Sequence, residues 1–223
     1  MTTEAENLVR RIAVDLSDVE RALRAHPYAQ AFRGGTAPVE AIVPFLGHQY
    51  HVAHADARSG ALLVHRFDDS PAGGFCRGFL QGGFSALTEI PVMAEKAGLS
   101  EADLRAYEPR ADGFAYAAYV SLLAAHGTVA EVMCGFLVNL PAWGFNCGEI
   151  GQGLRDNYGW PQPATAFVDA FAALPSFDDE ALPVIQAGLD RGESPQHIAR
   201  VARLIQSYER MFWDAMAAAA GLG

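Results

Sequence analysis

The last part of the chain carries the side chains best suited to chemistry. Glu209, Phe212 and Trp213 are spaced i, i+3 and i+4, which places them on one face of a helix. If the two rings are buried, the carboxylate lies near the core as well, where desolvation raises its pKa and suits it to proton transfer. The alternative is a glutamate at the rim of the helix, solvated or ion-paired. The pattern alone leaves both interpretations open.

A second candidate region is the stretch LVNLPAWGFNCGEIG, residues 137–151. Pro141 removes a backbone hydrogen bond in the middle of an expected helix and Gly144 loosens it, so a kink is predicted there. Freed carbonyl groups and the side chains of Asn139, Asn146 and Cys147 could then line a cavity. A close crossing with another helix would favour the same small residues, and this interpretation stays open beside the first.

Polar residues also gather between positions 48 and 58. His48, His51 and His54 drift by about 60° per step around a helix, so they cannot share one narrow ridge. A two-histidine metal pair is conceivable, but the chain has no Glu-x-x-His pair of the kind used by di-iron helical proteins. We therefore predict no metal site and no cofactor, with the histidines at the surface or hydrogen-bonded. For Asp56 and Arg58, an ion pair with a neighbouring helix is preferred over contact with a ligand.

The charge balance limits the partners. The net charge is −10, with 16 Lys and Arg against 26 Asp and Glu, and no basic stripe is present. Nucleic acid binding needs concentrated positive charge, so this class is excluded. Apolar segments fall short of the ~20 residues of a membrane span, and the N-terminal segment does not resemble a signal peptide. Three cysteines without metal spacing are typical of reduced thiols, and we expect a cytoplasmic protein that binds no membrane.

Helices must position these groups, because apolar residues recur at three- and four-residue spacing and no strand-like alternation persists. Ser100 with Asp103 predicts a capped short helix, and Ser194 with Pro195 predicts the start of the last one. We expect one domain, residues 1–223, of eight or nine helices. Their main ranges are 4–25, 44–67, 73–96, 112–126, 128–155, 164–173, 177–191 and 195–220, with loops at 34–36 and 157–161.

Several motifs resemble the TenA/thiaminase II family, which has a heme-oxygenase-like fold. YERMFWD at 208–214 is similar to the family's C-terminal signature, and HPYAQAFRGGTAPVEAIVPFL at 26–46 to its opening segment. FAYAAYV at 114–120 and GEIGQGL at 148–154 are similar to two further helices. The motifs occur in the family's order over nearly the whole chain. The resemblance implies an all-α, heme-oxygenase-like multi-helix bundle.

The resemblance also implies a chemistry, residue by residue. Family members hydrolyse an aminopyrimidine, releasing ammonia or the thiazole of thiamin, with a cysteine nucleophile, an aspartate, several tyrosines and a late glutamate. Glu209 matches the late glutamate, whereas Gln49 replaces the aspartate and Trp143 stands at the nucleophile position. Cys147 and Phe171 stand where the family has tyrosines. The chain therefore resembles a divergent member of the family.

These replacements have physical consequences. Tryptophan offers no nucleophilic lone pair, and Gln49 keeps hydrogen-bonding capacity without a negative charge. Cys147, about one turn beyond Trp143, could project a thiol into the same cavity. Either Tyr116 or Tyr119 matches the remaining pocket tyrosine, and the sequence does not say which.

Our hypothesis is a protein that binds a small nitrogen heterocycle in a buried cavity, with hydrolysis of a C–N bond left open. Glu209 would move protons, and Cys147 is the candidate nucleophile. The alternatives are a non-catalytic metabolite-binding or accessory protein and, third, a metal-dependent oxygenase. By analogy with relatives we expect a homodimer or homotetramer. The residues expected to contact the ligand are Gln49, Tyr50, Tyr116, Tyr119, Asn139, Trp143, Phe171 and Phe212.

Overall fold

Amphipathic helices build the molecule. The computed structural model describes residues 2–222, and within that range every regular element is a helix, which confirms the all-α prediction. The elements are α1 (Glu4–Asp15), α2 (Ser17–Arg24), α3 (Pro27–Arg33), η1 (Val39–Ala41), α4 (Ile42–Phe67), α5 (Gly73–Lys96), α6 (Glu101–Ala106), α7 (Ala111–His126), α8 (Val129–Tyr158), η2 (Gln162–Thr165), α9 (Ala166–Ala172), α10 (Asp178–Asp190) and α11 (Pro195–Ala220).

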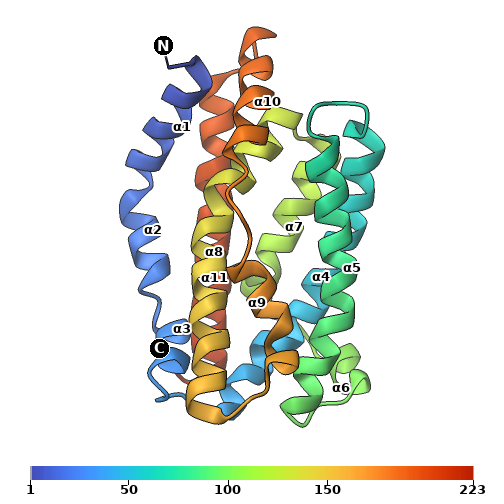
Figure 1. Ribbon diagram of the computed structural model, residues 1–223, viewed down its shortest axis with the longest axis vertical. Coiled ribbons are helices and arrows are strands. Elements are labelled where there is room, and N and C mark those ends of the chain that lie inside the picture. Colours follow the sequence, from blue (N-terminus) through green and yellow to red (C-terminus); the bar gives the residue numbers. More distant parts are fainter. Residues whose placement is uncertain (1, 223) are drawn as a thin grey trace.

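Helices α8 and α11 form the centre of the bundle (Figure 1). They lie side by side along its longest axis, with α1 and α2 on one side and α4, α5 and α7 on the other. Helix α11 also contacts α7, and α4 contacts both α5 and α7. Helix α9 packs on α8, and the chain then ascends to α10. Within residues 2–222, no helix combines the length and apolar character needed to cross a membrane.

Most predicted boundaries agree with the structure, but the first helix does not. The segment 4–25 is divided at Leu16, whose backbone leaves the helical conformation at φ −98° and ψ 2°. The division lets α1 pack on α10 and α2 pack on α8. The loop expected at 157–161 begins later, because α8 continues to Tyr158 and Gly159 ends it in the left-handed conformation, at φ 67°. Helix α8 runs through Pro141 as one helix.

The buried apolar residues form two clusters. One gathers around Tyr28, Phe45 and Trp213, and the other around Met133, Phe136 and Ile198. Each long central helix contributes to both clusters.

Polar side chains lie where the two clusters meet. On α8, Asn139 follows Leu137 of one cluster and precedes Ala142 of the other, and on α11 Glu209 lies between Ile205 and Phe212 in the same way. Burying such groups is unfavourable unless they are hydrogen-bonded. This border is therefore the place in the fold where polar groups are held inside the bundle.

One tertiary contact outside this border can be tested directly. Arg66 of α4 donates to the Ala124 carbonyl at 2.6 Å and the Gly127 carbonyl at 2.8 Å, at the end of α7 where carbonyls lack helical partners. We expect Arg66→Ala to lower the free energy of unfolding by about 1–3 kcal/mol in urea denaturation followed by circular dichroism. Arg77→Ala, which removes an exposed ion pair with Asp68, is the control and should change it by no more than about 0.5 kcal/mol. An equal change in the free energy of unfolding in the two variants would contradict a stabilising role for the hydrogen bonds of Arg66.

Candidate functional site

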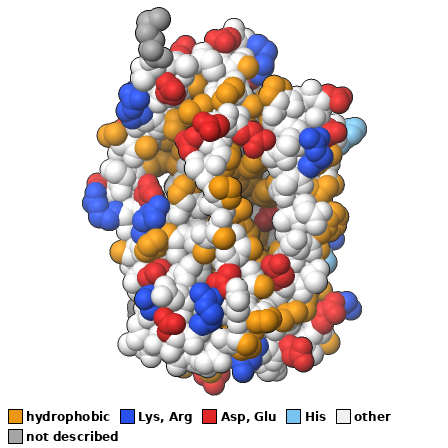
Figure 2. Space-filling view, in the orientation of Figure 1, with side chains coloured by type: hydrophobic (Ala, Val, Ile, Leu, Met, Phe, Trp, Pro, Cys, Tyr) orange, Lys and Arg blue, Asp and Glu red, His pale blue; other side chains and the backbone are white. Residues whose placement is uncertain are grey.

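A cavity of about 830 Å³ opens on one face of the bundle. Residues of α4, α5, α7, α8, α9 and α11 line it, together with residues of α1, α2 and α10 and of the segment 173–177 that joins α9 to α10. Figure 2 shows the face hollowed near its middle, with hydrophobic side chains around the hollow. Gly78 and Gly82 of α5 and Leu174 to Ser176 are exposed along its rim. The cavity is thus open on one side, which corrects the expectation of a fully buried one.

The carboxylate of Glu209 forms part of the inner wall. It is 1% exposed, and the Trp213 indole donates to its Oε1 at 3.0 Å. The Asn139 amide donates to its Oε2, and the Tyr116 hydroxyl donates to the amide oxygen of Asn139 at 2.8 Å. Glu209 and Trp213 come from α11, Asn139 from α8 and Tyr116 from α7. Glu209 therefore faces inward, which is one of the two interpretations that the spacing with Phe212 and Trp213 left open, rather than lying at the rim.

Burial changes the proton affinity of this carboxyl. Desolvation raises the pKa of Glu209 from 4.5 to about 8, against the opposing effect of the hydrogen bonds from Trp213 and Asn139. Burial also raises the pKa of the Tyr116 hydroxyl well above 10, with contributions from the nearby charges of Asp56 and Glu209. At neutral pH Glu209 can thus hold a proton and release it, which suits a group that exchanges protons with a ligand.

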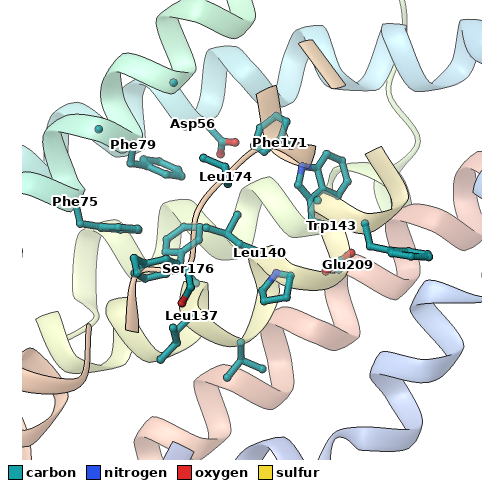
Figure 3. A pocket seen from close by; sticks show the side chains of 18 of the residues that line it. Asp56, Phe75, Phe79, Leu137, Leu140, Trp143, Phe171, Leu174, Ser176 and Glu209 are labelled. Carbon is teal, nitrogen blue, oxygen red and sulfur yellow. The ribbon is translucent and has the colours of Figure 1, made fainter. Parts of the chain in front are cut away.

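Asp56 is a second carboxyl in the cavity, where the sequence analysis did not place it. The expected ion pair with a neighbouring helix is absent among residues 2–222, and its Oδ1 is buried without a hydrogen-bond partner. Burial raises its pKa from 3.8 to about 7. Figure 3 shows the side chain pointing into the cavity from α4. A signal existed in the sequence, because Gln49, Val52, Ala53 and Asp56 share one face of a helix.

Aromatic rings complete the wall near Glu209. Trp143 meets Phe212 at 5.5 Å and Phe171 at 5.7 Å between ring centroids, both in edge-to-face geometry. All three line the cavity, as does Gln49, which is 5% exposed. Gly144 lets α9 approach, because a Cβ there would lie 2.7 Å from the Phe171 carbonyl oxygen. Segment 137–151 thus both lines the cavity and makes a close helix crossing.

Three of the candidate residues lie elsewhere. The Tyr50 hydroxyl accepts a hydrogen bond from Arg105 at 3.3 Å, beside a separate surface pocket. Tyr119 packs on Tyr208 with centroids 4.9 Å apart and does not line the cavity, so Tyr116 is the tyrosine that does. Cys147 is buried in the apolar cluster around Phe45 and does not line the cavity either. Asn139 does not line the cavity, but it is hydrogen-bonded to Tyr116 and Glu209, which do.

The histidines of α4 are separated by the helix geometry. Both ring nitrogens of His48 are engaged by the backbone: Nδ1 lies 2.7 Å from the Pro44 carbonyl, and Nε2 accepts from Arg110 at 3.0 Å. His51 and His54 border the surface pocket beside Tyr50. In the described part of the chain, no three side chains of metal-binding type come together.

The arrangement defines a helical bundle with an acidic, aromatic cavity that opens on one face. The chain belongs to the TENA/THI-4/PQQC family, whose model matches residues 15–219. The heme-oxygenase-like fold expected from the motifs is confirmed by solved structures. No curated protein matches the chain.

Three solved structures illustrate the likeness. A TenA homolog from Pseudomonas syringae pv. tomato is 11% identical, with a TM-score of 0.79 over 94% of this chain and 92% of its own. A TenA homologue from Pyrococcus furiosus is 17% identical, with a TM-score of 0.73 over 94% and 99%. A domain of unknown function with a heme oxygenase-like fold, from Shewanella denitrificans, is 13% identical, with a TM-score of 0.72 over 100% and 95%. At these identities the likeness establishes the fold.

Removing the charge of Asp56 should stabilise the folded protein. Because its pKa rises from 3.8 to about 7 on folding, ionisation of this carboxyl destabilises the fold increasingly as pH rises from about 4 to 7. We expect Asp56→Asn to be roughly 1–3 kcal/mol more stable than the parent at pH 8 in urea denaturation, with the difference shrinking toward pH 5. His26, His48 and His54 titrate alike in both proteins, so the difference isolates Asp56. A variant less stable than the parent at pH 8 would contradict the placement of Asp56 in a buried site without a partner for its charge.

The thiols should resist alkylation in the folded protein. Burial raises the pKa of Cys76 to about 11 and of Cys134 to about 12, and raises that of Cys147 well above 9. Since the thiolate is the reactive form, iodoacetamide at pH 8 should leave the mass of the native protein unchanged. In urea all 3 cysteines should be modified. Rapid modification of Cys147 in the native protein would show that its thiol is accessible after all.

Proposed function

We propose that this protein binds a small nitrogen heterocycle, of the pyrimidine or thiamin-related class, in the cavity beside Glu209. The observation that carries the proposal is a carboxyl held inside an aromatic wall by Asn139 and Trp213. Each oxygen of a carboxylate can accept more than one hydrogen bond, so Glu209 retains capacity for a ligand. Family membership supports a thiamin-related ligand.

The neighbouring residues suit an aromatic ligand with polar edges. Trp143, Phe171 and Phe212 present rings against which a flat heterocycle can pack, in stacked or edge-to-face geometry. Gln49 offers one amide donor group and one acceptor, and can therefore pair with a ring nitrogen or an exocyclic amine. The aromatic rings supply most of the contact area, and the polar groups fix the orientation of the ligand.

Hydrolysis of a C–N bond is a second candidate function, favoured by the two carboxyls. Asp56 and Glu209 have pKa values near 7 and 8, so one can accept a proton while the other donates one. Water would attack the ring carbon that bears an amino group and give a proton to the ionised carboxyl. The protonated carboxyl would donate to the amine, the C–N bond would break, and ammonia would leave. This route needs no cysteine at the position of Trp143.

Glu209→Gln separates the two functions. Binding is measured by calorimetry with thiamin and a panel of aminopyrimidines, and turnover by ammonia or thiazole release. If the protein is a hydrolase, we expect the variant to keep its affinity within a few-fold and to lose about a hundredfold or more in turnover, because a proton-transfer group is removed. Glu95→Gln, at an exposed glutamate outside the cavity, is the control and should retain both.

Binding without turnover in the parent protein would establish the accessory, non-catalytic interpretation. Failure of the parent to bind or turn over any heterocycle of the panel would overturn the proposal. The glutamine amide can accept hydrogen bonds at its oxygen only, so Glu209→Gln alters the contacts with Asn139 and Trp213. A thermal melt of the variant therefore checks that the protein is still folded.

A further inference from the structure

The cavity has an apolar end beyond its polar groups. Phe75 and Phe79 of α5 meet Phe136 of α8 with ring centroids 5.5 and 4.9 Å apart, and Phe177 lies 5.2 Å from Phe75. All four line the cavity, and we call them the phenylalanine end. In Figure 3, Phe75 and Phe79 lie on the side of the cavity away from Trp143 and Phe171. A ligand at Glu209 alone would leave this end unfilled.

Asp56 lies between the two ends. Two close contacts show which residues of α4 and α5 lie opposite each other. A Cβ at Gly83 would be 3.1 Å from the Ala57 Cα, and a Cβ at Gly60 would be 2.8 Å from the Leu80 Cα. Asp56 is thus level with Gly83, about one helical turn from Phe79. Gln49 is about 10 Å from Asp56 along the axis of α4 in the opposite direction. Figure 3 agrees, with Asp56 between Phe79 and Phe171.

The charge of the lining has one sign. The charged residues that line the cavity within the described chain are all acidic: Asp56, Asp178, Glu180, Glu209 and Glu20, the last of which is ion-paired with Arg24. A cavity with charges of one sign and apolar walls attracts ions of the opposite sign. Glu209 already accepts hydrogen bonds, whereas Oδ1 of Asp56 is buried without a partner among residues 2–222. A cation beside Asp56 would satisfy this oxygen.

We infer that the cavity takes an elongated ligand whose cationic nitrogen pairs with Asp56 and whose apolar arm lies among Phe75, Phe79 and Phe136. This inference rests on the proposed function and specifies the ligand of the same cavity. A volume of about 830 Å³ suits a ligand much larger than one heterocyclic ring. The ligand class is an amine or protonated heterocycle that carries a hydrocarbon or aryl arm, with its polar edge toward Glu209.

The charge requirement is tested with ω-phenylalkylamines of increasing chain length, and with the matching alcohols as uncharged probes. Calorimetry should show that the amines bind at least about tenfold more tightly than the alcohols, as expected for a charge-assisted hydrogen bond. Asp56→Asn should abolish this preference. Asp69→Asn, at an exposed carboxylate outside the cavity, changes the net charge equally and should preserve it. An amine preference that survives in Asp56→Asn would overturn the inference.

The apolar arm is tested at Gly78, where an added Cβ would meet no atom within 4 Å. In the parent protein each added methylene should tighten binding by about fourfold until the arm fills the phenylalanine end. Gly78→Leu should remove this gain and leave benzylamine binding within about twofold, because only the far end is filled. Gln81→Leu, at an exposed site of α5 outside the cavity, should behave as the parent does. An unchanged dependence on chain length in Gly78→Leu would overturn the placement of the arm.

The two proposals fail in different ways. If the amines bind through Asp56 but no heterocycle binds, the proposed function is wrong and the cation site stands. If heterocycles bind and Glu209→Gln changes their affinity or turnover, the proposed function stands. If amines and alcohols then bind with equal affinity, the cation site is wrong.

Discussion

The bundle depends on how it accommodates a carboxyl group at its centre. Glu209 lies where two apolar clusters meet, and an isolated carboxylate there would be strongly disfavoured. Its contacts with Asn139 of α8 and Trp213 of its own helix satisfy both oxygens. A further hydrogen bond at 2.8 Å joins the Gln206 amide to the Val138 carbonyl, at the same level of α11 and α8. These contacts fix the register of the two central helices, against which the other helices pack.

The cavity follows from that register and from helices that are held apart on one side. On the closed side, glycines permit close approach: Gly144 accommodates the backbone of α9, and Gly60 and Gly83 let α4 and α5 pack tightly. Away from these crossings, Phe75 and Phe79 of α5 contact Phe136 of α8 and form the phenylalanine end of the cavity. Pro141 leaves the Leu137 carbonyl without its usual helical donor, on the face of α8 that lines the hollow. The same few helices thus provide both the tight crossings and the space.

Sequence patterns predicted the elements better than the inner wall. Periodicity, the Ser100 and Ser194 caps and the glycine and proline positions were enough to locate most helices, because these signals are local. The inward position of Glu209 was one of the two interpretations that its spacing with Phe212 and Trp213 left open. Asp56 was assigned to an ion pair because charged residues usually have partners, and which of Tyr116 and Tyr119 faces the cavity depends on the rotation of α7 against α11. The rotation of α7 arises from tertiary packing and leaves no local pattern, whereas the helix face that Asp56 shares with Gln49 was a signal that the ion-pair assignment did not use.

The wall formed by α4 and α5 is difficult to explain by stability alone. Glycine within a helix costs about 1 kcal/mol relative to alanine, and at Gly78 and Gly82 an added Cβ would meet nothing within 4 Å among residues 2–222. Steric crowding therefore requires glycine at Gly83 and Gly60 but not at these two cavity positions. Asp56 adds an ionisable group whose charge the fold does not neutralise. The helical glycines and the unpartnered carboxyl are both unfavourable for stability, and both lie on the wall of the same cavity. Such features are typical of a binding site, where a ligand supplies the missing contacts.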